Sequence, residues 1–202
     1  EASSHGLSKK TNRLGDVLFD AVAMMNVTHE HLEFHGTHEQ YKIDKANLFK
    51  AIDEHDHIKN IAHCSTPIPA FGVVNLEDPS AEYFIESTKL PVYGFTTNGE
   101  AGASCKGLAS EDVTADTKKC VPASTWQGSN ISSDSRGVNF TFTGSETISN
   151  SPNSPDYTQD LRINLPGTFN VYNTLAAVIL VAGIMEIPTK TVTAHLEKLL
   201  PV

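Results

Sequence analysis

Residues 19–27 read Phe-Asp-Ala-Val-Ala-Met-Met-Asn-Val, a nearly continuous apolar run. A strand that is buried on both faces of a parallel sheet has this character, whereas a strand with one face in water alternates apolar and polar residues. Residues 71–75, Phe-Gly-Val-Val-Asn, repeat the signal, and residues 90–95 supply another short apolar stretch. The first half of the chain therefore predicts buried, parallel strands.

Helical signals lie between these strands. Thr37 followed by Gln40 forms a capping-box pattern ahead of apolar residues at mostly helical spacing in residues 41–52. Asp78-Pro79 predicts the start of a second helix, with the aspartate as N-cap and the proline in the first turn. Strands that alternate with helices indicate right-handed βαβ units and helices on both faces of the sheet.

The second half of the chain has a different pattern. Between residues 103 and 165, segments with alternating apolar residues are separated by Ser, Asn, Gly and Pro, which is typical of antiparallel strands. The alternation is clearest at Val138, Phe140 and Phe142, and at Leu161, Ile163 and Leu165. Residues 170–185 predict an apolar helix and residues 189–200 an amphipathic one. The predicted fold is α/β, a mostly parallel sheet flanked by helices with an antiparallel edge subsheet.

Composition narrows the class of protein. The chain has 202 residues, 39% of them hydrophobic, and a formal net charge of -9. One domain is expected, and nucleic acid is not an expected partner because no cluster of Lys and Arg is present to replace its counterions. The longest apolar run, residues 175–185, is too short to span a bilayer, and three irregularly spaced cysteines suggest reduced thiols. We expect a soluble, cytoplasmic protein, most simply a monomer, with no membrane partner.

The densest group of titratable residues is His-Glu-His-Leu-Glu-Phe-His at 29–35, directly after the first predicted strand. Ligand sites of open α/β sheets lie at such positions, so histidines and carboxylates of this loop are candidate ligands of a divalent ion. A solvated polar loop explains the same residues. Ser3-Ser4-His5 lies outside a G-x-S-x-G elbow and has no acid partner evident in the sequence, which disfavours a serine hydrolase.

Several blocks, in order, resemble the central, ATP-binding domain of Mur ligases. They are Glu1-Ala-Ser-Ser-His5, Asn26-Val-Thr-His-Glu-His-Leu-Glu-Phe-His-Gly36, Tyr41-x-x-x-Lys45-Ala-x-Leu-Phe49, Val73-Val-Asn-Leu-Glu-Asp78 and Gly167-Thr-Phe-Asn-Val-Tyr-Asn173-Thr-Leu-Ala-Ala177. The His-Gly and Ser-Ser-His segments, with residues 93–95 and 99–104, favour the UDP-N-acetylmuramoyl-tripeptide synthetase type. Glu30 and Glu33 depart from the family pattern, which has shorter aspartates there.

The resemblance implies an ATP-dependent, amide-bond-forming ligase of peptidoglycan biosynthesis that uses Mg²⁺. Its partners would be UDP-MurNAc-dipeptide, UDP-MurNAc-L-Ala-D-Glu, and an amino acid, joined through an acyl phosphate. It also implies roles for particular residues: metal ligands at Glu1, His31 and Lys45, catalysis by His31 and a carbamylated Lys45, ATP binding by Asn170 and Asn173, and substrate binding by Ser3, Thr11 and Arg13. Without these motifs, Lys45 reads as a solvated helix lysine and Asn170 as an N-cap.

No G-x-x-x-x-G-K-[ST] loop, which cradles nucleotide phosphates, occurs in the sequence. We therefore expect residues 1–202 to be a partial Mur ligase central domain that is truncated at both ends, with the phosphate-binding loop and the C-terminal domain outside it. Taken alone, these residues are expected to be inactive. The alternatives are another amide ligase of the superfamily, similar to folylpolyglutamate or cyanophycin synthetase, or a non-catalytic binding module.

Overall fold

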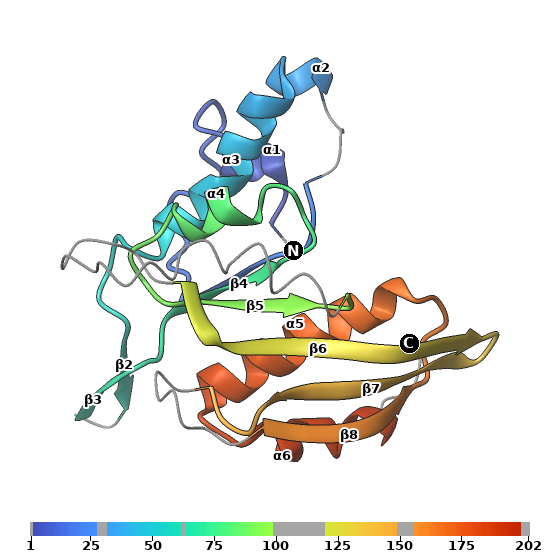
Figure 1. Ribbon diagram of the computed structural model, residues 1–202. Coiled ribbons are helices and arrows are strands. Elements are labelled where there is room, and N and C mark those ends of the chain that lie inside the picture. The colour runs from blue at the N-terminus through green and yellow to red at the C-terminus, as the bar shows by residue number, and fades with distance from the viewer. Residues whose placement is uncertain (1, 28–31, 62–63, 99–119, 149–155, 199–202) are drawn as a thin grey trace, which may run out of the picture.

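A six-stranded sheet forms the centre of the protein, in a computed structural model that describes residues 2–27, 32–61, 64–98, 120–148 and 156–198 (Figure 1). The strand order is β1-β4-β5-β6-β7-β8. The parallel strands are β1 (Ala21–Met24), β4 (Phe71–Asn75), β5 (Val92–Thr96) and β6 (Cys120–Asp134). Antiparallel pairing adds β7 (Gly137–Ser145) and β8 (Asp156–Ile163). The predicted fold, a mostly parallel sheet with an antiparallel edge, is confirmed.

Both faces of the sheet are covered, which is why the central strands are apolar throughout. Every residue of β4 and β5 is buried. On one face pack α3 (His38–Ala51) and α4 (Ala81–Ile85), whose core includes Phe49 and Phe84. On the other face pack α5 (Phe169–Met185) and α6 (Thr189–Thr193), with Trp126 and Leu175 in the core. Figure 1 shows these two layers with the sheet between them.

Short elements complete the described chain: α1 (Ser4–Leu7), α2 (Leu32–His35), a hairpin of β2 (Ile58–Ile61) and β3 (Cys64–Pro67), and the 3₁₀ helix η3 (Leu196–Lys198). Thr37 caps α3 as predicted, because its Oγ1 accepts a hydrogen bond from the Gln40 amide at 3.1 Å. No helix in the described ranges is long and apolar enough to cross a membrane.

Some predicted boundaries are wrong. The second helix begins at Ala81 and not at Pro79, because the Asp78 carboxylate accepts from the Ser80 amide at 2.8 Å and forms a turn before the helix. Leu165 lies beyond β8 and is 43% exposed. The helix predicted over residues 189–200 ends at Thr193 and gives way to η3. Hydrogen bonds from the Thr189 and Thr193 hydroxyls attach this short helix to β7 and β8.

The carboxyl ends of the parallel strands are tied together by side chains. Asn75 Nδ2 donates to the Met25 carbonyl at 3.0 Å, and the Val27 amide donates to Asp78 Oδ2 at 2.7 Å. These two bonds fix the segment after β1 against the segment after β4. The two segments at the carboxyl ends of β1 and β4, where ligands of such sheets bind, are thus positioned relative to each other.

Candidate active site

A cavity of about 470 Å³ opens at the carboxyl end of β1. It is lined by Ala2, Leu7, Ala23, Met24, Met25, Asn26, Lys45, Leu48, Phe49, Phe84 and Asn173. Segments far apart in sequence meet here: the start of the chain, the end of β1, one face of α3, and single residues of α4 and α5. Ligands of open α/β sheets bind outside the carboxyl ends of the strands, so this cavity is the candidate active site.

Lys45 is the one cation among the described residues that line this cavity. Its Nζ lies 5.4 Å from the centre of the Tyr41 ring, one helical turn earlier in α3, and its side chain is half-buried. No carboxylate of the described residues lines the cavity. The amine is therefore the group here that can gain a charge-reversing modification or contact an anion.

Asn170 and Asn173 lie together near the start of α5. Asn173 Nδ2 donates to Asn170 Oδ1 at 3.2 Å, and Asn170 Nδ2 donates to the Pro166 carbonyl at 2.8 Å. The N-cap of α5 is Thr168, so the alternative prediction that Asn170 is the N-cap is wrong. Asn173 is exposed and lines both the large cavity and a smaller one of about 290 Å³ beside Asn75 and Tyr172.

The residues predicted to bind the muramoyl peptide lie directly before and after α1. Ser3 is exposed and caps α1, its Oγ accepting from the Gly6 amide at 3.2 Å. The Thr11 hydroxyl donates to the carbonyl oxygens of His5 and Ser8. Arg13 is exposed. Ser3 adjoins the cavity through Ala2, whereas Thr11 and Arg13 do not line it.

Glu1 and His31, the other predicted metal ligands, lie outside the described residues. Of the residues adjacent to them in sequence, Ala2 lines the cavity and Leu32 begins α2. The convergence of Glu1, His31 and Lys45 on one site therefore stays a prediction.

A buried hydrogen-bonded chain joins α1, α2 and α3, and the sequence reading missed it. His35 Nδ1 lies 2.7 Å from Asp44 Oδ2, and His35 Nε2 lies 3.1 Å from Ser4 Oγ. Gly36, at a φ of 81°, turns the chain between α2 and α3 so that His35 faces Asp44. Ser4 thus has the acid partner that the sequence did not reveal. Ser4 is only 4% exposed, however, so a substrate cannot reach its hydroxyl. The hydrogen bonds among Ser4, His35 and Asp44 are therefore structural and do not form a hydrolytic site.

Glu77 forms a second missed network, at the carboxyl ends of β4 and β5. Its Oε1 accepts from the Thr97 and Asn98 amides and from the hydroxyls of Thr96 and Thr97, and its Oε2 accepts from the Tyr172 hydroxyl at 3.0 Å. Partial burial by itself would raise the pKa of the Glu77 carboxyl, but these donors outweigh it and lower the pKa. Partial burial and the nearby Glu77 charge raise the pKa of Tyr172. The polar residues Asn75, Glu77 and Asp78, at the end of a buried strand, were the sequence feature that could have predicted this network.

A parallel α/β sheet with a cavity at its strand ends is the architecture of many nucleotide-binding proteins. The model of the Mur ligase middle domain matches residues 1–181. The chain belongs to the Mur ligase family, and the match to its middle domain covers the sheet, both networks and the cavity.

Relatives agree on the type. The chain is 37% identical over 202 residues to the UDP-N-acetylmuramyl-tripeptide synthetase of Treponema pallidum and 41% identical to that of Treponema denticola, covering 100% of this chain in both cases. It is 28% identical, over 98% of its length, to the UDP-N-acetylmuramoyl-L-alanyl-D-glutamate--2,6-diaminopimelate ligase of Bacillus licheniformis. The chain spans about a third of these relatives, 35%, 32% and 32% of their lengths respectively.

Among solved structures, MurF from Acinetobacter baumannii superposes with a TM-score of 0.57 at 15% identity, covering 92% of this chain and 30% of that one. This likeness supports the fold.

Proposed function

We propose that the protein adds the third amino acid to UDP-MurNAc-L-Ala-D-Glu at the expense of ATP, a step of peptidoglycan biosynthesis, and that these 202 residues supply part of its ATP-binding domain. The observation that carries the proposal is the cavity at the end of β1, where Lys45 and Asn173 converge in a Mur ligase middle domain. Support for the substrate comes from relatives that cover the whole chain and bear the name UDP-N-acetylmuramyl-tripeptide synthetase.

The proposed reaction has two steps. A carboxylate oxygen of the dipeptide attacks the γ-phosphorus of ATP, and ADP leaves with the electron pair of the broken P–O bond. The amino group of the incoming amino acid then attacks the acyl carbon of the acyl phosphate; inorganic phosphate leaves and the amine loses a proton. Both steps depend on positioning and on neutralising phosphate charge.

The residues of this chain have separate tasks in the proposal. Asn170 and Asn173 present amide groups to the nucleotide from the start of α5. Ser3, Thr11 and Arg13 hold the muramoyl peptide, and the guanidinium of Arg13 suits a carboxylate because it offers a planar pair of donors. The exposure of Ser3, Arg13 and Asn173 leaves them accessible to ligands.

The cavity fits Mg²⁺ only with a change at Lys45. Mg²⁺ prefers oxygen ligands, yet the described lining offers amide and carbonyl oxygens and one lysine. Reaction of the neutral Lys45 amine with CO₂, with loss of a proton, creates a carbamate that supplies anionic oxygen. We propose that this carbamate, with Glu1 and His31, holds the metal, and that His31 and Lys45 are catalytic through it. Bound Mg²⁺ would offset the charge of the phosphoryl group being transferred.

The test uses the full-length protein with UDP-MurNAc-L-Ala-D-Glu, ATP, Mg²⁺ and a panel of amino acids. We expect tripeptide product and its loss in Lys45→Ala, while Lys50→Ala, at an exposed lysine of the same helix, retains activity. Residues 1–202 alone should form no product, because they contain no phosphate-cradling loop. Ligation of a different acceptor, such as a folate, would favour another ligase of the superfamily. An inactive full-length protein that binds the nucleotide sugar would favour a binding module.

The proposal also places the protein in the cytoplasm as a monomer that binds neither nucleic acid nor membrane.

A further inference from the structure

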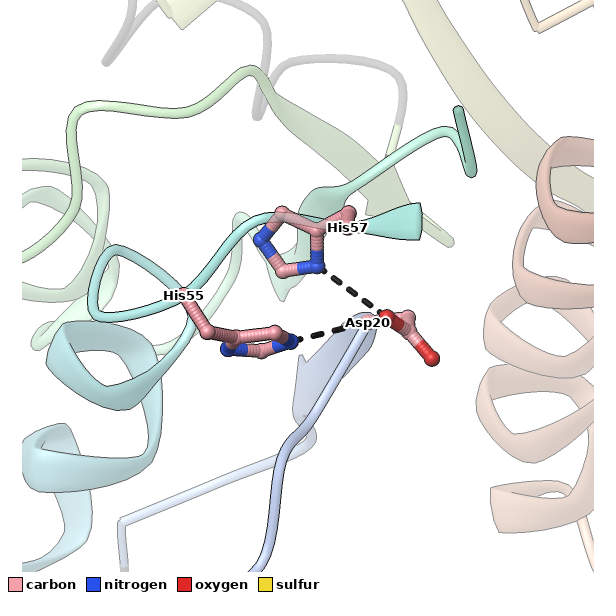
Figure 2. A group of neighbouring side chains, drawn as sticks. All are labelled: Asp20, His55 and His57. Carbon is pink, nitrogen blue, oxygen red and sulfur yellow. Dashed lines mark hydrogen bonds and ion pairs between the residues drawn. The ribbon is translucent and has the colours of Figure 1, made fainter. Parts of the chain in front are cut away.

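Two histidines and an aspartate gather at the opposite end of β1 from the cavity. Asp20 directly precedes β1, and His55 and His57 lie in the loop between α3 and β2 (Figure 2). One ligand atom from each lies within 4.8 Å of the other two, and this is the one such group of three or more His, Cys, Asp or Glu in the part of the chain that the structure describes. Neither the cavity nor the proposed ligase chemistry uses these residues.

The orientation of His57 defines which nitrogen is available. His57 Nε2 donates to the Ile52 carbonyl at 2.7 Å, so this nitrogen carries a hydrogen. Nδ1 then faces Asp20 Oδ1 at 3.1 Å. In the neutral ring, Nδ1 has a lone pair directed at a carboxylate oxygen, which is repulsive unless a cation lies between them. A backbone carbonyl that fixes the far nitrogen is also the usual support of a metal-bound histidine.

His55 completes the arrangement. Its Nε2 lies 3.6 Å from Asp20 Oδ1, too far for a good hydrogen bond, and its ring packs against that of His57 with centroids 4.1 Å apart. The other nitrogen of His55, Nδ1, is buried and has no hydrogen-bond partner among the described residues. Figure 2 shows both rings directed toward the Asp20 carboxylate, which remains 41% exposed.

The spacing matches a tetrahedral ion. Bonds of about 2.0–2.1 Å from Zn²⁺ to nitrogen and oxygen, at the tetrahedral angle, place neighbouring ligand atoms about 3.4 Å apart. The observed separations from Asp20 Oδ1, 3.1 Å to His57 and 3.6 Å to His55, lie on either side of this value. Two imidazoles and one carboxylate suit borderline ions such as Zn²⁺ and Co²⁺, whereas Mg²⁺ prefers a ligand set made mainly of oxygen. The exposed side of Asp20 leaves room for water as the fourth ligand.

We propose that Asp20, His55 and His57 form a binding site for a divalent transition-metal ion, Zn²⁺ being the best match. The ion joins the start of β1 to the loop that follows α3. The same loop continues into β2, and the His57 carbonyl accepts from the Ile68 amide at 2.6 Å, just after β3. A metal here therefore stabilises three segments without contacting the nucleotide cavity.

The experiment is a titration of untagged, chelator-treated full-length protein with Co²⁺ in excess Mg²⁺, followed by the visible absorption of protein-bound Co²⁺ and by competition with Zn²⁺. Excess Mg²⁺ keeps sites built from oxygen ligands filled, and neither ATP nor substrate is present, so the result does not depend on ligase activity. We expect one saturable site with a tetrahedral spectrum at this position and displacement of Co²⁺ by Zn²⁺.

Variants locate the site. Asp20→Asn, which keeps the side-chain volume, and His57→Ala should each weaken Co²⁺ binding by at least about tenfold, since even residues behind the ligands have effects of that size. His195→Ala removes an exposed histidine of the C-terminal segment and should bind as the wild type does. Circular dichroism confirms that each variant is folded. Absence of saturable binding by the wild type, or equal binding by folded Asp20→Asn and wild type, would overturn the proposal and leave an ion pair between the aspartate and histidines.

Discussion

Asp44→Ala tests whether the buried Ser4–His35–Asp44 chain holds α1 and α2 against α3. Asp44 is 2% exposed and accepts from His35 Nδ1 at 2.7 Å and from Gln40 Nε2 at 3.1 Å. The substitution leaves the buried His35 donor without an acceptor, which costs about 1–3 kcal/mol. If His35 carries a charge in the folded state, leaving that charge unpaired costs about 3–5 kcal/mol. We expect the free energy of unfolding to fall by about 3 kcal/mol, roughly a 150-fold rise in the unfolding constant.

The assay is urea unfolding followed by the fluorescence of Trp126, the single tryptophan of these residues, which is fully buried in the core. Glu39→Ala on the same helix is the control. Glu39 is 62% exposed and pairs with Lys42 at 2.9 Å, so its removal should change the free energy of unfolding by at most about 0.5 kcal/mol. Asp44→Asn keeps one acceptor oxygen and should fall between the two. If Asp44→Ala unfolds within 0.5 kcal/mol of Glu39→Ala, the reasoning about the buried chain is refuted.

Three further predictions address other parts of the molecule. The lowered pKa of Glu77 means that its ionised form stabilises the folded state above the ordinary carboxyl pKa of 4.5 and that this contribution disappears as pH falls through the lower folded-state value. The stability difference between wild type and Glu77→Gln, measured by urea unfolding at several pH values, should therefore shrink on acidification; a constant difference would contradict the assignment. A Cβ at Gly144 would overlap the Trp126 indole, so Gly144→Ala should lower the free energy of unfolding by about 1–3 kcal/mol, and an unchanged denaturation midpoint would show that this contact is not tight. On the proposed function, Asn173→Ala should raise the KM for ATP about fivefold, the equivalent of one hydrogen bond of about 1 kcal/mol, and steady-state kinetics with an unaltered KM would remove Asn173 from the nucleotide site.

Local signals in the sequence were sufficient for the fold class and for the buried strands β1, β4 and β5, but not for α1, α2 or the β2–β3 hairpin. The run at residues 71–75 is apolar because β4 is covered on both faces, and the structure gives β4 those same bounds. Thr37 caps α3 because its hydroxyl is close in sequence to the amide that needs an acceptor. Lys45 and Asn173 were predicted as site residues from the resemblance to Mur ligases and not from local signals; both line one cavity in the structure.

The tertiary structure decided which distant polar residues are partners. Ser4, His35 and Asp44 are separated by up to 40 positions in the chain, and each is unremarkable until three helices bring them together in a buried contact. Asp20 and His57 meet only because the loop after α3 returns to the start of β1. Thr189 and Thr193 of α6 likewise donate hydrogen bonds to β7 and β8, contacts that the amphipathic pattern of residues 189–200 does not reveal. Periodicity and capping depend on neighbours within a few residues and are therefore readable from sequence, whereas hydrogen bonds and ligand sets between distant segments exist only once packing has fixed the distances between them.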